Sequence, residues 1–217
     1  MPKASIKPVE RLGFDRRMTK DEINSQPIRN YEGKVAVIKT REALEDAIKQ
    51  LGKETLLGFD TETRPNFKKG QNNLPSLIQL ATRNAVYIFQ LRHLKFPAGL
   101  KKILANENII KAGVAVDHDL IQLQRLGSFT EGGFVELARL AKGAGIKNHG
   151  LRGLASVLLG FRISKGAQRS NWDNEILKNN QVRYAATDAW VGREIFLRLQ
   201  EMGMVYRDPV SGDIITN

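Results

Sequence analysis

The 217-residue sequence contains no cysteine and no apolar run of membrane-spanning length. Without cysteine there are no disulfides and no thiolate metal sites, which fits a reducing compartment. Without a long apolar run there is no candidate transmembrane helix. The N-terminal residues 1–18 also lack the apolar core of a secretory signal. We therefore expect a cytoplasmic protein with no membrane partner.

The sequence has fewer acidic than basic residues, with 23 Asp and Glu against 34 Lys and Arg. Its net charge is therefore +11. A balance this basic is typical of proteins with a polyanionic partner, most often nucleic acid, although solubility alone also accounts for it. An anionic membrane surface fits less well, because the sequence has no basic amphipathic helix. The sequence leaves the oligomeric state open.

Strand-like and helix-like patterns alternate through most of the chain, which is typical of a single α/β domain. A turn at Arg83-Asn84 between two apolar runs predicts a hairpin, so part of the sheet is expected to be antiparallel. The apolar runs predict strands at 35–38, 55–61, 74–82, 85–89 and 109–113. Apolar spacing and capping residues predict helices at 41–51, 98–105, 116–126, 134–142, 151–159 and 179–202.

Two segments fall outside this pattern. Residues 1–33 are interrupted by three prolines and contain few apolar residues, so we treat them as an N-terminal extension. Within it, the spacing of Thr19 and Glu22 fits a capping box for one short helix. The predicted domain covers 34–203, and 204–217 are expected to be a loose C-terminal tail.

The stretch Leu56–Thr63 begins as an apolar run typical of a buried strand and ends in two carboxylates, Asp60 and Glu62. Because side chains alternate along a strand, residues two apart point to the same face of the sheet. Two adjacent like charges repel, and a hard divalent cation between them would offset that repulsion. Taken alone, this short pattern fits two solvated acids at the end of a strand at least as well.

The last predicted helix carries Tyr184 and Asp188, which are four residues apart and therefore share a helix face. Apolar residues continue that face, so Asp188 is expected to point inward, where a carboxylate needs a partner. A hydrogen bond to neighbouring backbone would also satisfy it. A fourth acid, Asp119, lies early in the helix that follows the strand 109–113, where the helix dipole alone favours an acid.

Together these pieces resemble the DEDD 3′–5′ exonucleases, in the branch that carries a tyrosine. The matches to the first, second and third exonuclease motifs are, in order, Asp60-x-Glu62, Gly113-x5-Asp119 and Tyr184-x3-Asp188. The resemblance covers about 33–200, and the relatives it resembles most are the RNase D catalytic domain and the exonuclease domain of the Werner syndrome helicase. The other branch of the family has a histidine at the position of Arg183.

The resemblance implies a ribonuclease H-like α/β fold, with a mixed central sheet flanked by helices. It also implies a 3′–5′ exonuclease that hydrolyses DNA or RNA from a free 3′ end with two Mg²⁺ or Mn²⁺ ions. Asp60 would bridge both ions, Glu62 and Asp188 would complete the site that activates water, and Asp119 would hold the second ion. Tyr184 would orient the attacking water.

Five residues near the motifs are candidates for contact with the nucleic acid. Lys68 and Lys69 follow the first motif, and Lys165 and Arg169 precede the third, so all four could meet phosphates. Trp172 could stack on a base or pack in the core. Two other functions stay open, namely a nucleic-acid-binding module without turnover on the same fold and an endonuclease. The complete acid set favours an enzyme over the binding module.

Overall fold

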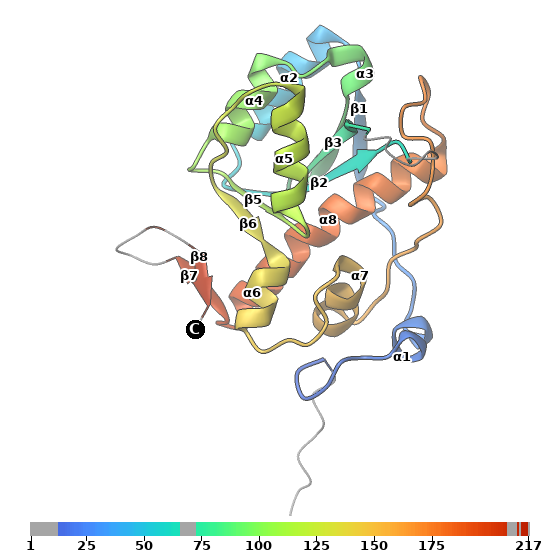
Figure 1. Ribbon diagram of the computed structural model, residues 1–217, viewed down its shortest axis with the longest axis vertical. Coiled ribbons are helices and arrows are strands. Elements are labelled where there is room, and N and C mark those ends of the chain that lie inside the picture. Colours follow the sequence, from blue (N-terminus) through green and yellow to red (C-terminus); the bar gives the residue numbers. More distant parts are fainter. Residues whose placement is uncertain (1–12, 66–72, 208–211, 213, 217) are drawn as a thin grey trace, which may run out of the picture.

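A mixed six-stranded sheet forms the centre of the protein (Figure 1). The computed structural model describes residues 13–65, 73–207, 212 and 214–216. The strands are β1 (Lys34–Ile38), β2 (Leu56–Thr63), β3 (Pro75–Ala81), β4 (Ala85–Gln90), β5 (Ile110–Gly113) and β6 (Phe134–Glu136). Their order is β1-β4-β3-β2-β5-β6. Only β3 runs antiparallel to its neighbours in this sheet, so the mixed sheet predicted from the sequence is confirmed.

Helices cover both faces of the sheet, as Figure 1 shows. The described helices are α1 (Lys20–Ser25), α2 (Arg41–Leu51), α3 (Leu91–Leu94), α4 (Ala98–Ala105), α5 (Val116–Leu126), α6 (Leu137–Gly143), α7 (Leu151–Leu154) and α8 (Asn179–Glu201). Helices α2, α4 and α5 pack against one face of the sheet and share an apolar cluster with it. Helices α6, α7 and α8 pack against the opposite face of the sheet. None of the helices in the described ranges is long and apolar enough to cross a membrane.

The alternation of side chains along β2 divides it between these two layers. Leu57 and Phe59 are fully buried in the cluster with α2, α4 and α5. Leu56 belongs to the cluster on the opposite face, which includes residues of α8. The odd and even positions of β2 therefore face different helices, as the two-residue period of a strand requires.

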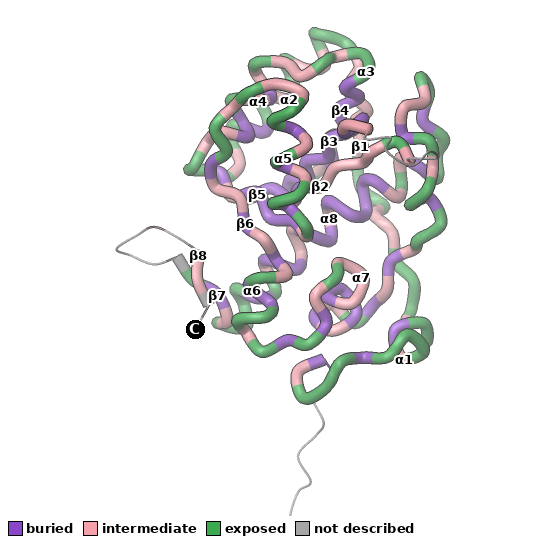
Figure 2. The backbone as a smooth tube through the Cα atoms, viewed as in Figure 1, coloured by how far each residue is buried: buried purple, intermediate pink, exposed green. Residues whose placement is uncertain are grey.

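The long helix α8 packs unusually close to the sheet. A Cβ atom built on Gly58 of β2 would lie 1.9 Å from the carbonyl oxygen of Ala189. Small residues on the inner side of α8, including Ala185 and Gly192, are also fully buried, and Figure 2 shows the helix largely in the buried colour. This close contact fixes the position of α8, and therefore of its polar side chains, relative to the end of β2.

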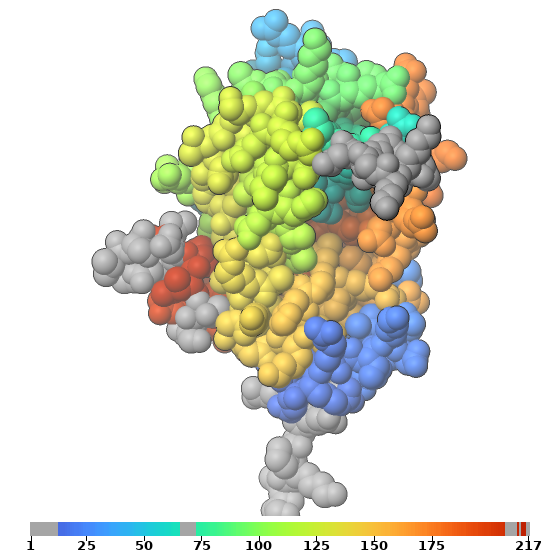
Figure 3. Space-filling view, viewed as in Figure 1, coloured from blue at the N-terminus to red at the C-terminus, as the bar shows by residue number. Residues whose placement is uncertain are grey.

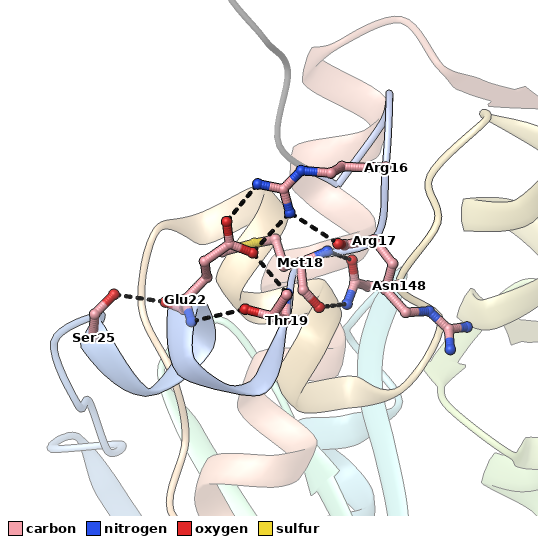
Figure 4. Close-up of polar contacts among 7 residues, drawn as sticks. All are labelled: Arg16, Arg17, Met18, Thr19, Glu22, Ser25 and Asn148. Atoms are coloured by element: carbon pink, nitrogen blue, oxygen red, sulfur yellow. Dashed lines mark hydrogen bonds and ion pairs between the residues drawn. The ribbon is translucent and has the colours of Figure 1, made fainter.

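Residues 13–33 lie against the rest of the chain, and Figure 4 shows part of this contact. The predicted capping box is confirmed, because the Glu22 amide donates to the Thr19 hydroxyl and the Thr19 amide donates to the Glu22 carboxylate. Two hydrogen bonds join this segment to a distant loop. The Met18 amide donates to Asn148 Oδ1 (2.9 Å), and Asn148 Nδ2 donates to the Met18 carbonyl (3.3 Å).

Most of the predicted elements are confirmed, some to the residue. The predicted helix with a Thr40 cap corresponds to α2, and α4 and α5 have the predicted bounds. The hairpin at Arg83-Asn84 joins β3 to β4. The predicted strand 55–61 extends to Thr63 as β2, so both of its carboxylates lie within the strand.

Three predictions of secondary structure were wrong in part. The predicted helix 134–142 begins with β6, because these apolar residues pair with the open edge of β5 and the helix follows only at Leu137. The predicted helix 151–159 changes after α7 to a π-helical turn, η1 (Ala155–Leu159), and ends at Gly160 with a left-handed φ of 72°. The tail was expected to be loose, yet β7 (Val205–Arg207) pairs with β8 (Ile214–Thr216).

Candidate active site

Asp60 and Glu62 form the strand-borne half of an acidic cluster. Both are half-buried on β2, and both point to the face that carries α8, as their spacing predicts. Asp60 lies directly opposite Gln79 of β3, and Glu62 opposite Leu77, so pairing on this side holds the carboxylates in place. A register irregularity follows between Glu62 and Thr63, where the pairing with β3 ends.

Helix α8 supplies the other half of the cluster. Asp188 is 7% exposed, and one of its carboxylate oxygens lies within 4.8 Å of an oxygen from both Asp60 and Glu62. Tyr184 lies one turn earlier on the same helix and contributes to the same depression. This pocket of about 220 Å³ is lined by Phe59, Asp60, Thr61, Glu62, Val114, Leu151, Gln168, Tyr184 and Asp188. Figure 3 shows the surface hollowed between the teal residues of β2 and the orange-red residues of α8.

Asp119 approaches the cluster from the opposite side of β2. Its Oδ1 accepts a hydrogen bond of 2.9 Å from the hydroxyl of Thr61, the residue between the two strand carboxylates. Asp119 is half-buried and lies outside the group of three oxygens within 4.8 Å. Its neighbour Asp117 is exposed and forms an ion pair with Arg139 instead. The structure therefore places Asp119, and not Asp117, beside the acidic cluster.

The start of α5, which positions Asp119, depends on a residue that the sequence did not single out. Ala115 precedes the helix with a left-handed φ of 64°, a conformation that is unfavourable for alanine. Glu136 stabilises this start because its Oε2 accepts a hydrogen bond of 2.7 Å from the Val116 amide. Its other oxygen accepts a hydrogen bond from the Ala138 amide at the start of α6. One carboxylate thus anchors two helix N-termini.

Every carboxylate of the cluster has a raised pKa. Burial raises the pKa of Asp60 well above its usual range, and the charges of Asp188, Glu62 and Asp119 raise it further. Burial and the charges of Asp188 and Asp119 raise the pKa of Glu62 to about 9. Burial raises the pKa of Asp119 to about 7, although the hydrogen bond from Thr61 lowers it. Burial likewise raises the pKa of Asp188 to about 7, although the hydrogen bond from Tyr184 lowers it. Among the described residues, no cation lowers the pKa of any of these four acids.

The Tyr184 hydroxyl remains protonated throughout the physiological range. Burial raises its pKa, and the negative charges of Asp188 and Glu62 raise it further because they disfavour a phenolate. A protonated hydroxyl in this position can donate a hydrogen bond but cannot accept a proton as a base. The centre of its ring lies 5.8 Å from that of Trp172, a contact that helps to position the ring.

The donor set of the cluster fits divalent cations. Asp60, Glu62 and Asp188 offer only oxygen ligands, which hard cations such as Mg²⁺ and Mn²⁺ prefer. Asp188 Oδ1 is buried and has no hydrogen-bond partner among the described residues. A cation would satisfy this oxygen and offset the repulsion that raises the pKa values. Uncompensated burial of several carboxylates is otherwise unfavourable.

The five candidates for nucleic-acid contact differ in how exposed they are in the structure. Lys68 and Lys69 lie outside the described residues. Lys165 and Arg169 are exposed, and Lys165 lines a groove that also reaches Tyr184 and Asp188. Trp172 is fully buried in the core against α8. The prediction that it stacks on a base was therefore wrong, and its alternative, packing in the core, is confirmed.

Two residues of the pocket were not among the predicted site residues. Leu151, at the start of α7, lines the pocket. Gln168 lines it from the connection before α8. Both come from segments that the acidic motifs do not include, and only the packing of those segments against α8 brings them here.

Carboxylates that converge from a central strand and a crossing helix offer the oxygen ligands that a divalent-cation-dependent hydrolase requires. A family model described as 3′–5′ exonuclease matches residues 35–203. The chain belongs to this 3′–5′ exonuclease family. It is 35% identical over 165 residues to the bifunctional 3′–5′ exonuclease/ATP-dependent helicase WRN of Mus musculus, covering 73% of this chain and 12% of the mouse protein.

Solved structures of low sequence identity share the fold. The Nibbler EXO domain of Aedes aegypti is 24% identical and superimposes with a TM-score of 0.70, covering 82% of this chain and 94% of that chain. Escherichia coli RNase D is 20% identical, with a TM-score of 0.68 over 78% of this chain and 46% of that chain. The predicted ribonuclease H-like fold is therefore confirmed.

Proposed function

We propose that this chain removes nucleotides from the 3′ end of a nucleic-acid strand by metal-dependent hydrolysis. The observation that carries the proposal is the convergence of Asp60, Glu62 and Asp188 within 4.8 Å, beside Tyr184 in one pocket. Membership of the 3′–5′ exonuclease family supports the direction of cleavage. Because the chain spans 12% of the mouse WRN protein, the substrates of such larger proteins do not transfer to it directly.

The proposed cofactor is a pair of Mg²⁺ or Mn²⁺ ions. Asp60, Glu62 and Asp188 would hold them, with Asp119 contributing from the other side of β2. Such ions supply three effects when bound, namely neutralisation of the phosphate, a lower pKa for water and stabilisation of the leaving oxygen. The raised pKa values and the unpartnered Asp188 oxygen support this ligand set.

The side chains of the protein then orient the attacking water and the phosphate. Tyr184, protonated and in contact with the ring of Trp172, donates a hydrogen bond that orients the attacking water or a phosphate oxygen. Thr61 holds Asp119 toward the site through its hydroxyl. The apolar residues Val114 and Leu151 line the pocket in which the terminal nucleotide would lie. We assign the chain to the tyrosine branch of the family on the strength of Tyr184.

A strand labelled at its 5′ end tests this function. Incubation with Mg²⁺ or Mn²⁺ should give a ladder of products that shorten from the 3′ end, and chelator should abolish it. A single internal product would indicate an endonuclease, and binding without any product would indicate a module without turnover. Parallel digestion of single-stranded DNA, recessed duplex DNA and structured RNA would identify the preferred substrate.

A further inference from the structure

A groove of about 540 Å³ continues from the acidic pocket toward the N-terminal segment. Leu151, Gln168, Tyr184 and Asp188 line both depressions, so the two are contiguous. The far part of the groove is lined by Arg17, Met18, Lys20 and Ile23 on one side, and by residues 148–153 and 163–165 on the other. A strand whose end occupies the pocket therefore has a continuous path across this surface.

The N-terminal wall lies before the family-matched region, which begins at residue 35. Hydrogen bonds nevertheless fix it in place. Besides the paired bonds between Met18 and Asn148, Arg17 Nε donates to the Lys147 carbonyl (3.1 Å). Arg152 joins the two walls, because its Nη2 donates to Asn24 Oδ1 (2.7 Å) and its Nε to the Ile163 carbonyl (3.0 Å). The groove is thus preformed, and Figure 4 shows the paired hydrogen bonds between Met18 and Asn148.

The groove has the electrostatic character that a phosphate backbone requires. Arg17, Lys20 and Lys165 are exposed along it, and Asp188 is the one carboxylate among its lining residues. Glu22 lies close by, but its carboxylate is paired with Arg16. The lining residues of the groove therefore include several cations, and their one carboxylate belongs to the acidic cluster. Met18 and Ile23, which are largely buried, form part of the groove wall between these cations.

We propose that this groove binds the single-stranded segment that lies 5′ of the terminal nucleotide, with Arg17 and Lys20 contacting its phosphates. The proposal rests on the proposed function, since it assigns the acidic pocket to the 3′ end. It gives the N-terminal segment a specific role, namely affinity for strands long enough to extend beyond the pocket. Substrates of one or two nucleotides would not reach Arg17 and Lys20.

Equilibrium binding of a fluorescent 12-nucleotide strand, measured by anisotropy in chelator across a salt series, tests this groove without turnover. The double variant Arg17→Gln with Lys20→Gln should weaken binding roughly tenfold near 100 mM salt. Its plot of log affinity against log salt should be shallower by about 1.4, since each phosphate contact on a single strand contributes about 0.7. In Mg²⁺, its preference for the 12-nucleotide strand over a dinucleotide should fall by a similar factor.

Two matched variants separate local charge from other effects. Lys49→Gln with Lys102→Gln removes two exposed charges from α2 and α4, on the other side of the sheet, and should leave the salt slope within 0.3 of wild type. Arg17→Lys with Lys20→Arg keeps both charges and should retain most of the affinity. Equal losses in the groove variant and the distant variant, or an unchanged slope in the groove variant, would overturn the proposal. Wild type that binds and shows the groove effect yet releases no 3′ nucleotides would instead count against the proposed function alone.

Discussion

The hydroxyl of Thr61 donates a hydrogen bond of 2.9 Å to Asp119, which joins the first turn of α5 to the carboxylate-bearing end of β2. Asp117, two residues earlier on the same helix, points away and pairs with Arg139 on the surface. Two residues on a helix differ by about 200° in direction, so only one of these acids can face the site. This geometry allows a direct comparison of the two acids.

Asp119→Asn should reduce turnover by at least about 10²-fold, whereas Asp117→Asn should change it by less than twofold. The first substitution removes a charge beside the cluster, and the second removes half of an exposed ion pair, which is worth little. Steady-state rates at saturating Mg²⁺ on a labelled strand provide the measurement. A larger loss with Asp117→Asn would show that the second motif had been placed in the wrong register.

Tyr184→Phe should lower turnover by about 10²–10⁴-fold while leaving the protein folded and able to bind nucleic acid. The ring keeps its contact with Trp172, and only the donor hydroxyl is lost. Tyr87→Phe is a matched control, because Tyr87 packs in the cluster on the other face of the sheet. If both substitutions leave the rate unchanged, Tyr184 serves packing and not chemistry.

Gly58→Ala should strongly destabilise the protein, because the added Cβ would lie 1.9 Å from the Ala189 carbonyl oxygen and α8 would have to move. Overpacking of this kind costs about 1–3 kcal/mol or more, and about 1 kcal/mol lowers the melting temperature of a protein of this size by about 2–4 °C. Gly150→Ala is the matched control, with ordinary backbone angles and open space at its Cβ. Similar melting temperatures for the two variants would contradict the close contact between β2 and α8.

The metal-free protein should lose stability as the pH rises from 5.5 to 7.5. The pKa values of Glu62, Asp119 and Asp188 are about 9, 7 and 7 in the folded state, whereas unfolded Asp and Glu titrate near about 4. Between these limits the folded state binds more protons than the unfolded state, so the free energy of unfolding falls with pH. Above this window the lowered pKa of Lys111, about 8, acts in the opposite direction.

Urea unfolding in chelator at pH 5.5, 6.5 and 7.5 measures this dependence. Saturating Mg²⁺ should reduce the slope, since the bound cation holds the carboxylates ionised. A free energy of unfolding that rises with pH in chelator would show that these acids are individually stabilised, for example by unrecognised ion pairs, and do not repel one another.

Local periodicity predicted which acids share a face, and the family resemblance predicted that these faces meet in one site. The two-residue period of a strand placed Asp60 and Glu62 on one face, and the four-residue spacing placed Tyr184 and Asp188 on one face of a helix. The close approach of these two faces depends on Gly58 and the small residues of α8. These residues are far apart in the sequence, so local patterns do not predict their contact.

The remaining features depend on contacts between residues that are distant in sequence. Glu136 supports α5 only because β6 adds to the edge of the sheet, and a short apolar segment does not distinguish a strand from a helix. The wall formed by Arg17 and Lys20 exists because Met18 pairs with Asn148, 130 residues later. Trp172 was open to two interpretations because an aromatic residue in a basic connection suits both stacking and packing.

Thermal melting of wild type and Asp60→Asn, each with chelator and with excess Mg²⁺, tests most directly whether the four acids form one cation-binding cluster. In chelator the variant should melt at a higher temperature than wild type, because one of four mutually repelling carboxylates is removed. Excess Mg²⁺ should raise the melting temperature of wild type more than that of the variant, since at 100 times its Kd a ligand stabilises by about 2.7 kcal/mol. A variant that melts below wild type in chelator, with no difference in the response to Mg²⁺, would contradict the cluster and the nuclease function built on it.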